Sequence, residues 1–256
     1  MLKAVLFDLD DTLIDWSGFK SDWDEMESRH IGHVVDVIKN EGRGDKIQNA
    51  LTVAQAFRTR TKESWLQAGS TLRAPNMTSI LKETLEAFGV DTNDDDIRRY
   101  LEAYQWGAVP GTQIFPEVQD VLQILVDTGI KIGIVTNAFQ PMWLRDIEID
   151  AHGLLRFFPE ITYRHSAADV GYLKPHPEIF QKALASLGTT PAETVFVGDD
   201  LEADIAGAQG AGIQAILRRT ARYHGKTLRI SPDAIVNDLH EMLVIFDQWY
   251  PGWRNQ

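Results

Sequence analysis

Short apolar runs near the start of the chain and throughout its second half have the pattern of buried parallel strands. Few polar residues interrupt them, as is usual for strands covered by helices on both faces. The predicted strands are residues 3–7, 131–135, 194–197 and 214–217, with shorter ones at 160–163 and 234–236. Between them, residues 116–127 and 177–187 carry apolar side chains at helical spacing, and Gly129 and Gly188 stand where these helices end. Strands that alternate with helices predict an α/β fold with a parallel sheet.

Residues 16–111 have a different pattern, without the runs that are typical of buried strands. Turn-forming residues divide this stretch, and the segments between them are predicted to be helices. These predicted helices are residues 22–40, 45–68, 76–88 and 94–106. Thr92 and Asn93 are the candidate caps for the last of them, with acidic residues 94–96 in its first turn, where the helix dipole favours negative charge. We therefore predict an α/β core domain made of residues 1–15 and 112–256, and an inserted all-helical domain made of residues 16–111.

The composition is that of an ordinary globular protein with an excess of acidic residues. Of the 256 residues, 44% are apolar and 24% are charged, and the formal net charge is −12. This charge argues against nucleic acid or an anionic membrane as the main partner. Nothing approaches 18 consecutive apolar residues, and the first apolar run is too short for a signal peptide, so the expected location is the cytoplasm. The absence of cysteine excludes disulfides, zinc-thiolate sites and a cysteine nucleophile.

The first predicted strand ends in acidic residues. Asp8 and Asp10 are two positions apart, so in a regular strand their side chains would share a face. In open α/β sheets, ligands bind beyond the carboxyl ends of the strands. Two carboxylates held close together repel each other unless a cation compensates their charge. This motif alone indicates a cation site, although a solvated acidic turn also fits it.

A second acidic group follows the predicted strand at 194–197. Gly198 permits a tight turn there, and Asp199, Asp200 and Asp204 come after it. Mg²⁺ prefers such oxygen ligands, because it keeps several of its waters and takes only one or two carboxylates. Both acidic strand ends are therefore candidates for magnesium ligands.

Polar groups stand at two further places in the predicted core. Thr136 and Asn137 follow the strand at 131–135, where a hydroxyl and an amide can bind an oxyanion such as a phosphate oxygen. Lys174 precedes the helix at 177–187 in a proline-rich segment, whose stiffness can hold the lysine in place. Taken singly, ordinary turn chemistry and a surface lysine explain these residues better.

Taken together, these residues resemble the motif set of the haloacid dehalogenase superfamily. That family carries an aspartate pair and a threonine after its first strand, a serine or threonine after the second core strand, a lysine before a later helix, and acidic residues near the end. Here the corresponding residues are Asp8, Asp10, Thr12, Thr136, Lys174, Asp199 and Asp204. The likeness covers residues 1–15 and 112–240. It implies a Rossmann-like core with the helical insertion as a cap domain over the active site.

The resemblance implies a Mg²⁺-dependent phosphatase that works through an aspartyl-phosphate. Asp8 would attack the phosphorus, and Asp10 would protonate the leaving alcohol and then take a proton from the attacking water. Mg²⁺ would be held by the Asp8 carboxylate, the main-chain carbonyl group of Asp10, and Asp199. Either Asp200 or Asp204 would be a further ligand or would hold metal-bound water, and the sequence leaves that choice open.

The resemblance also implies how phosphate is bound and which reaction takes place. The phosphoryl oxygens would be bound by Lys174, Thr136 and the main-chain amides near Leu9 and Asn137. In the dehalogenase branch of the family, the position of Asp10 is not an aspartate, because a departing halide needs no proton whereas an alkoxide does. Asp10 therefore favours hydrolysis of a small phosphorylated metabolite. A phosphomutase or other phosphoryl transferase stays open, and a dehalogenase or a non-catalytic binding protein is disfavoured. The sequence does not decide whether the protein is a monomer or a homodimer.

Specificity is expected to come from the helical insertion. Its aromatic and basic side chains are candidate substrate contacts, although helix packing and a solvated helix face explain them at least as well. The candidates are Trp16, Trp23, Arg58, Arg60, Lys62, Trp65 and Trp106. His30 and His33 lie three apart on a predicted helix, but no third metal ligand is evident, so we expect a structural role for both.

Overall fold

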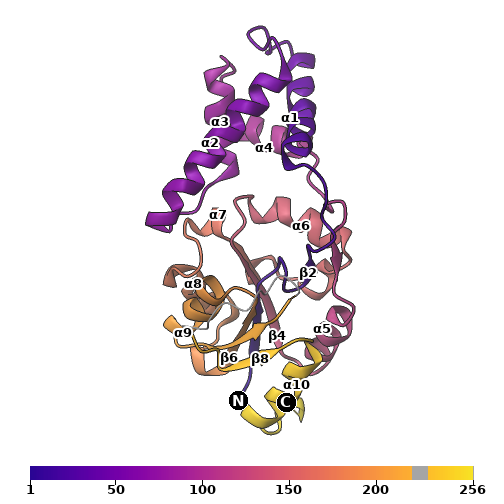
Figure 1. Ribbon diagram of the computed structural model, residues 1–256, viewed down its shortest axis with the longest axis vertical. Coiled ribbons are helices and arrows are strands. Elements are labelled where there is room, and N and C mark those ends of the chain that lie inside the picture. Colours follow the sequence, from indigo (N-terminus) through magenta and orange to yellow (C-terminus); the bar gives the residue numbers. More distant parts are fainter. Residues whose placement is uncertain (221–229, 256) are drawn as a thin grey trace.

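A six-stranded parallel sheet forms the centre of the computed structural model, which describes residues 1–220 and 230–255 (Figure 1). Its strands follow the spatial order β5-β4-β1-β6-β7-β8. They are β1 (Ala4–Phe7), β4 (Lys131–Thr136), β5 (Arg164–Ser166), β6 (Thr194–Gly198), β7 (Gln214–Arg218) and β8 (Ala234–Val236). A separate antiparallel pair joins β2 (Ile14–Asp15) to β3 (Gln113–Ile114). Because β1 lies between β4 and β6, the strand order reverses there, and sheets of this kind bind ligands beyond the carboxyl ends at that point.

Helices cover both faces of the sheet. They are α5 (Val118–Asp127), α6 (Met142–Ala151), α7 (Ala167–Val170), α8 (Pro177–Leu187), α9 (Gly207–Gly210) and α10 (His240–Trp249). In β1, Val5 and Phe7 belong to one hydrophobic cluster with side chains of α5, α6 and α10, whereas Ala4 and Leu6 belong to the other cluster with α8. All four side chains are fully buried, which explains the uninterrupted apolar run. The predicted Rossmann-like α/β fold is confirmed.

Two features of the core differ from the predicted elements. The strand predicted at 160–163 is wrong, because Ile161–Tyr163 form a 3₁₀ turn and β5 begins directly after it. Ile161 is exposed, so it does not pack into the core as the predicted strand would require. Helices α6 and α10 lie where the pattern predicts no element. In α6, the buried polar residues Arg145 and Glu148 interrupt the apolar stripe that would have indicated a helix.

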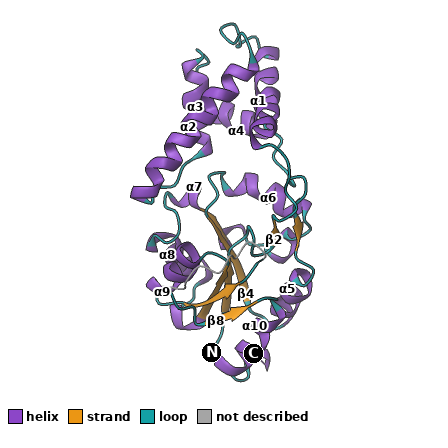
Figure 2. Cartoon of the chain, in the orientation of Figure 1, coloured by secondary structure: helices purple, strands orange, loops and turns teal. Residues whose placement is uncertain are grey.

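Four helices form a separate layer, here called the helical unit, on the side of the sheet opposite to the two termini (Figures 1 and 2). They are α1 (Trp23–Asn40), α2 (Ala50–Thr71), α3 (Met77–Ala87) and α4 (Asp94–Ala103). Helix α2 begins at Ala50 instead of residue 45, because the side chain of Asn49 caps it by accepting from the Leu51 amide (2.7 Å).

The predicted domain boundaries stay a prediction. Among the described residues, no helix has the length and apolar character needed to span a bilayer.

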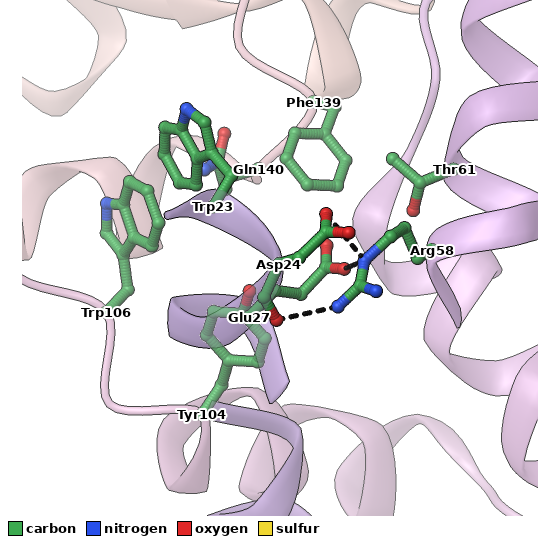
Figure 3. Close-up of a pocket in the computed structure, with 9 residues that line it drawn as sticks. All are labelled: Trp23, Asp24, Glu27, Arg58, Thr61, Tyr104, Trp106, Phe139 and Gln140. Carbon is green, nitrogen blue, oxygen red and sulfur yellow. Dashed lines mark hydrogen bonds and ion pairs between the residues drawn. The ribbon is translucent and has the colours of Figure 1, made fainter. Parts of the chain in front are cut away.

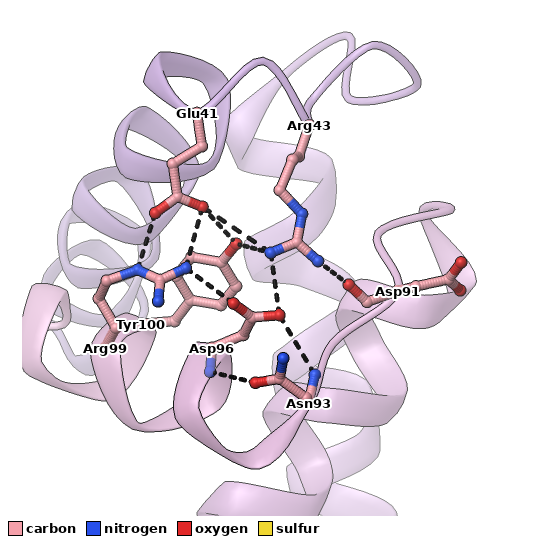
Figure 4. A network of polar contacts seen from close by, with 7 residues as sticks. All are labelled: Glu41, Arg43, Asp91, Asn93, Asp96, Arg99 and Tyr100. Carbon is pink, nitrogen blue, oxygen red and sulfur yellow. Dashed lines mark hydrogen bonds and ion pairs between the residues drawn. The ribbon is translucent and has the colours of Figure 1, made fainter.

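A network of charged side chains ties the end of α1 to the start of α4 (Figure 4). The predicted cap at Asn93 is confirmed, since its side chain accepts from the Asp96 amide (2.8 Å) while the Asp96 side chain accepts from the Asn93 amide (3.2 Å). Asp96 also pairs with Arg43 (2.9 Å) and Arg99 (2.8 Å), and Arg99 pairs with Glu41 (2.8 Å). These charges therefore anchor α4 within the helical unit.

The turn between α2 and α3 docks the helical unit on two core loops. The Leu173 amide donates to the Leu72 carbonyl oxygen (2.8 Å), and the Met77 amide donates to the Phe139 carbonyl oxygen (2.8 Å). One of these loops leads directly into Lys174, and the other follows β4. The helical unit therefore touches two of the loops that carry predicted site residues.

Candidate active site

The acidic residues of the two strand ends meet at the carboxyl edge of the sheet. Asp8 follows β1, Asp199 follows β6, and Asp204 lies in a π-helical segment (Leu201–Ala206) just beyond. One carboxylate oxygen from each of the three aspartates lies within 4.8 Å of the others. Asp8 and Asp204 are buried, whereas Asp199 is partly exposed. We name these three residues the aspartate cluster.

Lys174 brings an ammonium group into the aspartate cluster. Its Nζ donates to Asp8 Oδ1 (2.5 Å) and to the carbonyl oxygen of Val135 (2.8 Å), and it forms an ion pair with Asp204 Oδ1 (2.7 Å). Asn137 holds the lysine backbone, because its Oδ1 accepts from the Lys174 amide (2.7 Å) and its Nδ2 donates to the Lys174 carbonyl oxygen (3.2 Å). The side chain of Asn137 thus positions the lysine, and its main-chain amide is the group left for the predicted phosphate contact.

The electrostatics of the cluster show a deficit of positive charge. Burial raises the pKa of the Asp8 carboxyl to about 7, with Lys174 opposing the rise and Asp204 adding to it. Burial and the charges of Asp8 and Asp204 raise the pKa of Asp199 to about 9. Burial alone would lower the pKa of the Lys174 ammonium, but Asp204 and Asp8 outweigh burial and hold that pKa above its ordinary value. Three carboxylates share one ammonium, so a divalent cation would balance their charge.

The donor set fits a hard cation such as Mg²⁺, since it consists of carboxylate oxygens at the ends of buried strands. Gly198 is required beside the aspartate cluster, because a Cβ at that position would overlap the carboxyl group of Asp204.

The sequence left Asp200 and Asp204 as alternatives. The structure uses the Asp200 side chain as a helix cap, which accepts from the amides of Glu202 and Ala203 (2.8 Å each), and places Asp204 in the cluster.

Asp10 does not belong to the cluster. It is held by Arg145, which the sequence did not indicate, and by Trp16, which the sequence offered only as a candidate substrate contact. Its Oδ1 accepts from Arg145 Nη2 (2.7 Å) and from the indole nitrogen of Trp16 (2.9 Å). Arg145 is buried and pairs with Glu148 Oε2 (2.7 Å), which also accepts from the indole nitrogen of Trp106 (2.9 Å). The available sequence signal was an arginine and a glutamate three residues apart, next to apolar positions.

Thr136 lies at the carboxyl end of β4, where the sequence predicts it. It is buried and pairs in register with Ser166 of β5. Strand β4 also pairs with β1, with Ile134 opposite Phe7, so Thr136 and Asp8 follow neighbouring strands at the same edge. The register therefore places Thr136 at the same edge of the sheet as Asp8.

A pocket of about 250 Å³ lies between the helical unit and the loop after β4 (Figure 3). Three of the candidate contacts line it, namely Trp23, Arg58 and Trp106. Phe139 and Gln140 line it from the core side. The remaining candidates are not among its described lining residues: Trp16, Arg60, Lys62 and Trp65.

The two histidines of α1 have the geometry of packing residues. The His30 ring stacks on the Tyr104 ring (centroids 4.6 Å apart), and its Nδ1 contacts the Tyr104 carbonyl oxygen (2.6 Å). The rings of His30 and His33 are nearly perpendicular, with centroids 6.4 Å apart. These contacts agree with the expected structural role.

A doubly wound sheet with a buried lysine among carboxylates at its switch point defines an α/β enzyme core. The chain belongs to the haloacid dehalogenase-like hydrolase family, whose model matches residues 2–212, and the predicted resemblance is confirmed. The protein is therefore an enzyme of the hydrolase class.

Proteins similar to this chain include phosphatases and a dehalogenase. A glyceraldehyde 3-phosphate phosphatase of Methanopyrus kandleri is 29% identical over 91% of each chain. A phosphoglycolate phosphatase of Salmonella paratyphi A is 27% identical over 94% of this chain and 91% of its own length. The crystal structure of a 2-haloacid dehalogenase from Pseudomonas syringae pv. Tomato is 26% identical, with a TM-score of 0.62, and covers 97% of this chain and 100% of its own.

The aspartate cluster predicts that Mg²⁺ stabilises the protein more at high pH than at low pH. The pKa values of Asp8 (about 7) and Asp199 (about 9) in the folded protein lie above the ordinary value of 3.8. Between about pH 4 and pH 9 the folded protein therefore binds more protons than the unfolded chain, so the metal-free protein loses stability as the pH rises. Mg²⁺ bound to the cluster would relieve this repulsion and should raise Tm by several degrees more at about pH 8.5 than at about pH 5. Calorimetry in MgCl₂ and in EDTA measures this, and an equal rise at both pH values would contradict it.

Proposed function

We propose that this protein is a Mg²⁺-dependent phosphatase that hydrolyses the phosphate ester of a small metabolite through an aspartyl-phosphate on Asp8. The observation that carries this proposal is a buried Asp8 carboxylate in contact with Lys174 Nζ, with Asp199 and Asp204 close enough to share a cation. A carboxylate can attack a phosphate ester only when the negative charges of both are compensated. The phosphatase names of the relatives support the same reaction.

Asp8 supplies the attacking oxygen. One of its carboxylate oxygens forms a bond to phosphorus while the bond from phosphorus to the ester oxygen breaks, and the electron pair leaves with that oxygen. Lys174 keeps a fixed positive charge beside the transferred group, and the Thr136 hydroxyl and the main-chain amides of Leu9 and Asn137 bind its oxygens. Electrostatic positioning of this kind supplies most of the catalysis in phosphoryl transfer.

The metal site of this proposal uses the aspartate cluster. Mg²⁺ would be held by the carboxylates of Asp8 and Asp199 and the main-chain carbonyl group of Asp10, with Asp204 as a further ligand or as the partner of metal-bound water. When bound, the ion would neutralise charge on the phosphoryl oxygens.

Asp10 transfers the protons. Its carboxylic acid gives a proton to the departing alkoxide, and the resulting carboxylate then takes a proton from the water that attacks the aspartyl-phosphate. Because Arg145 and Trp16 both donate to Oδ1, the other oxygen, Oδ2, is the one that carries the proton. Arg145 therefore orients the acid as well as compensating its charge.

Dehalogenation is the second candidate, because the 2-haloacid dehalogenase shares the whole architecture. Halide departure needs no proton, however, and Asp10 would then have no part in the reaction. A buried arginine holds Asp10 in place, and this favours a reaction whose leaving group must be protonated. A phosphomutase would use the same residues and differ in returning the phosphoryl group to a substrate hydroxyl.

Phosphate release from p-nitrophenyl phosphate and a panel of phosphorylated metabolites tests the proposal. We expect release that needs Mg²⁺ and disappears in EDTA, with no halide released from 2-chloropropionate. Incubation with a phosphorylated substrate and an added acceptor alcohol distinguishes the two reactions. A transferase forms a new phosphate ester on the alcohol, whereas a hydrolase releases inorganic phosphate. Metal binding without release from any ester would overturn the proposal in favour of a binding protein.

A further inference from the structure

The pocket of Figure 3 has aromatic walls. Trp23 from α1, Tyr104 and Trp106 from the segment after α4, and Phe139 from the loop after β4 all line it. The rings of Trp23 and Trp106 are nearly parallel, with centroids 6.4 Å apart. We name this cavity the aromatic pocket. At about 250 Å³ it lies at the small end of ligand cavities and suits a small metabolite.

Two chains of contacts connect the walls of the aromatic pocket to Asp10. Trp23 stacks on Trp16 (centroids 6.0 Å apart), whose indole nitrogen donates to Asp10. Trp106 donates to Glu148, which pairs with Arg145, the other partner of Asp10. Asp10 is the proposed proton donor to the leaving group. The aromatic pocket therefore lies on the side of the site where the alcohol part of the ester must sit.

The charges that line the aromatic pocket determine which leaving groups it accepts. Its one cation among the described lining residues, Arg58, is already bound by two carboxylates, since its Nε contacts Glu27 Oε2 (3.0 Å) and Asp24 Oδ1 (3.1 Å). Figure 3 shows both carboxylates directed at this guanidinium. Burial raises the pKa of Glu27, but with Glu27 ionised or neutral these three side chains carry no net positive charge. A substrate with an anionic group besides its phosphate would therefore meet these carboxylates, and Arg58 would not be free to pair with it.

We propose that the aromatic pocket binds the leaving group of the ester and accepts a small, hydroxyl-bearing group without negative charge, such as a polyol or a sugar. Carboxylates accept hydrogen bonds from hydroxyl groups, and like charges brought together in a binding site are strongly unfavourable. The aromatic rings cover the apolar face of such a group. This inference rests on the proposed phosphatase function and adds the substrate class.

A series of two-carbon esters isolates charge from size. The three substrates are 2-hydroxyethyl phosphate, 2-phosphoglycolate and O-phosphoethanolamine, whose leaving groups are neutral, anionic and cationic. We expect kcat/KM for 2-hydroxyethyl phosphate to exceed that for 2-phosphoglycolate by about tenfold or more. An equal or higher value for 2-phosphoglycolate would overturn the inference. A highest value for O-phosphoethanolamine would overturn the hydroxyl-bearing class in favour of an amine.

Two variants locate the selection in the named carboxylates. Glu27→Gln and Asp24→Asn free Arg58 from one partner each, so both should shift the kcat/KM ratio towards 2-phosphoglycolate. The shift should be larger for Glu27, whose side chain is 15% exposed, than for Asp24, which is 68% exposed and screened by water. Glu25→Gln is the matched control on the same helix, because the Glu25 side chain is 77% exposed and pairs only loosely with Arg29 (3.7 Å).

The readout separates the two proposals. A ratio of two substrates measured on one preparation does not depend on the fraction of folded protein, so partial unfolding of a variant cannot imitate the shift. If the protein hydrolyses p-nitrophenyl phosphate but prefers 2-phosphoglycolate to 2-hydroxyethyl phosphate, the pocket inference is overturned and the phosphatase proposal stands. The same holds if Glu27→Gln leaves the kcat/KM ratio of these two substrates unchanged. Failure of every ester in Mg²⁺ would overturn both.

Discussion

Replacing Asp8 by asparagine is expected to lower phosphate release by about four orders of magnitude or more, since loss of a covalent nucleophile has effects of that size. The amide has the same shape as the carboxylate, and its oxygen still accepts from Lys174 Nζ. It cannot attack phosphorus, however, and no aspartyl-phosphate can form. Steady-state release of phosphate from p-nitrophenyl phosphate measures the loss.

Stability should move in the opposite direction in the same variant. Asp8 is buried beside Asp204 and Asp199, and its loss removes one of the repelling charges. We therefore expect an unchanged or higher Tm in EDTA and a smaller rise in Tm on adding Mg²⁺. Asp15→Asn serves as the control, because Asp15 lies on β2 outside the aspartate cluster, and its side chain accepts from the Ser17 amide (2.8 Å). Activity of Asp8→Asn within about a hundredfold of the wild type would contradict the assignment of the nucleophile.

The positions of the cluster residues could be predicted because they depend on short-range rules. A continuous apolar run marks β1 and β6, the first acidic residue after each run lies at the carboxyl end, and neighbouring parallel strands bring those ends together. Asp8 and Asp199 follow from these rules alone. The choice between Asp200 and Asp204 does not, because it depends on which carboxylate caps the next helical turn.

The residues around Asp10 could not be predicted, since their contacts join distant parts of the chain. Arg145 is separated from Asp10 by 135 residues and lies on a helix whose apolar stripe is broken by that arginine and by Glu148. The walls of the aromatic pocket raise the same difficulty. Trp23 and Trp106 stand near the two ends of the helical insertion, and sequence periodicity assigns them to helix packing as readily as to a pocket.

Replacing Lys174 by methionine is expected to damage both stability and activity. Methionine has a similar length but no charge, so the buried carboxylates of Asp8 and Asp204 would lose the ammonium that lies 2.5 and 2.7 Å from them. Removing one partner of a buried ion pair costs about 3–5 kcal/mol of unfolding free energy. This cost should be present in EDTA at about pH 8 and shrink towards about pH 5, because protonation of Asp8, whose pKa burial raises to about 7, removes part of the unpaired charge.

Mg²⁺ separates the two roles of this lysine. The ion supplies positive charge to the same carboxylates, so it should restore part of the lost stability of Lys174→Met. It cannot replace the ammonium beside the transferred oxygens, and kcat/KM should stay lower by about two to three orders of magnitude. Denaturant unfolding and phosphate release, each with and without Mg²⁺, measure these effects. Lys182→Met is the matched control, because Lys182 is 44% exposed and its loss should change the unfolding free energy by at most about 0.5 kcal/mol. Full recovery of activity with Mg²⁺ would show that Lys174 acts only by keeping the cluster folded, and that its charge has no part in the chemical step.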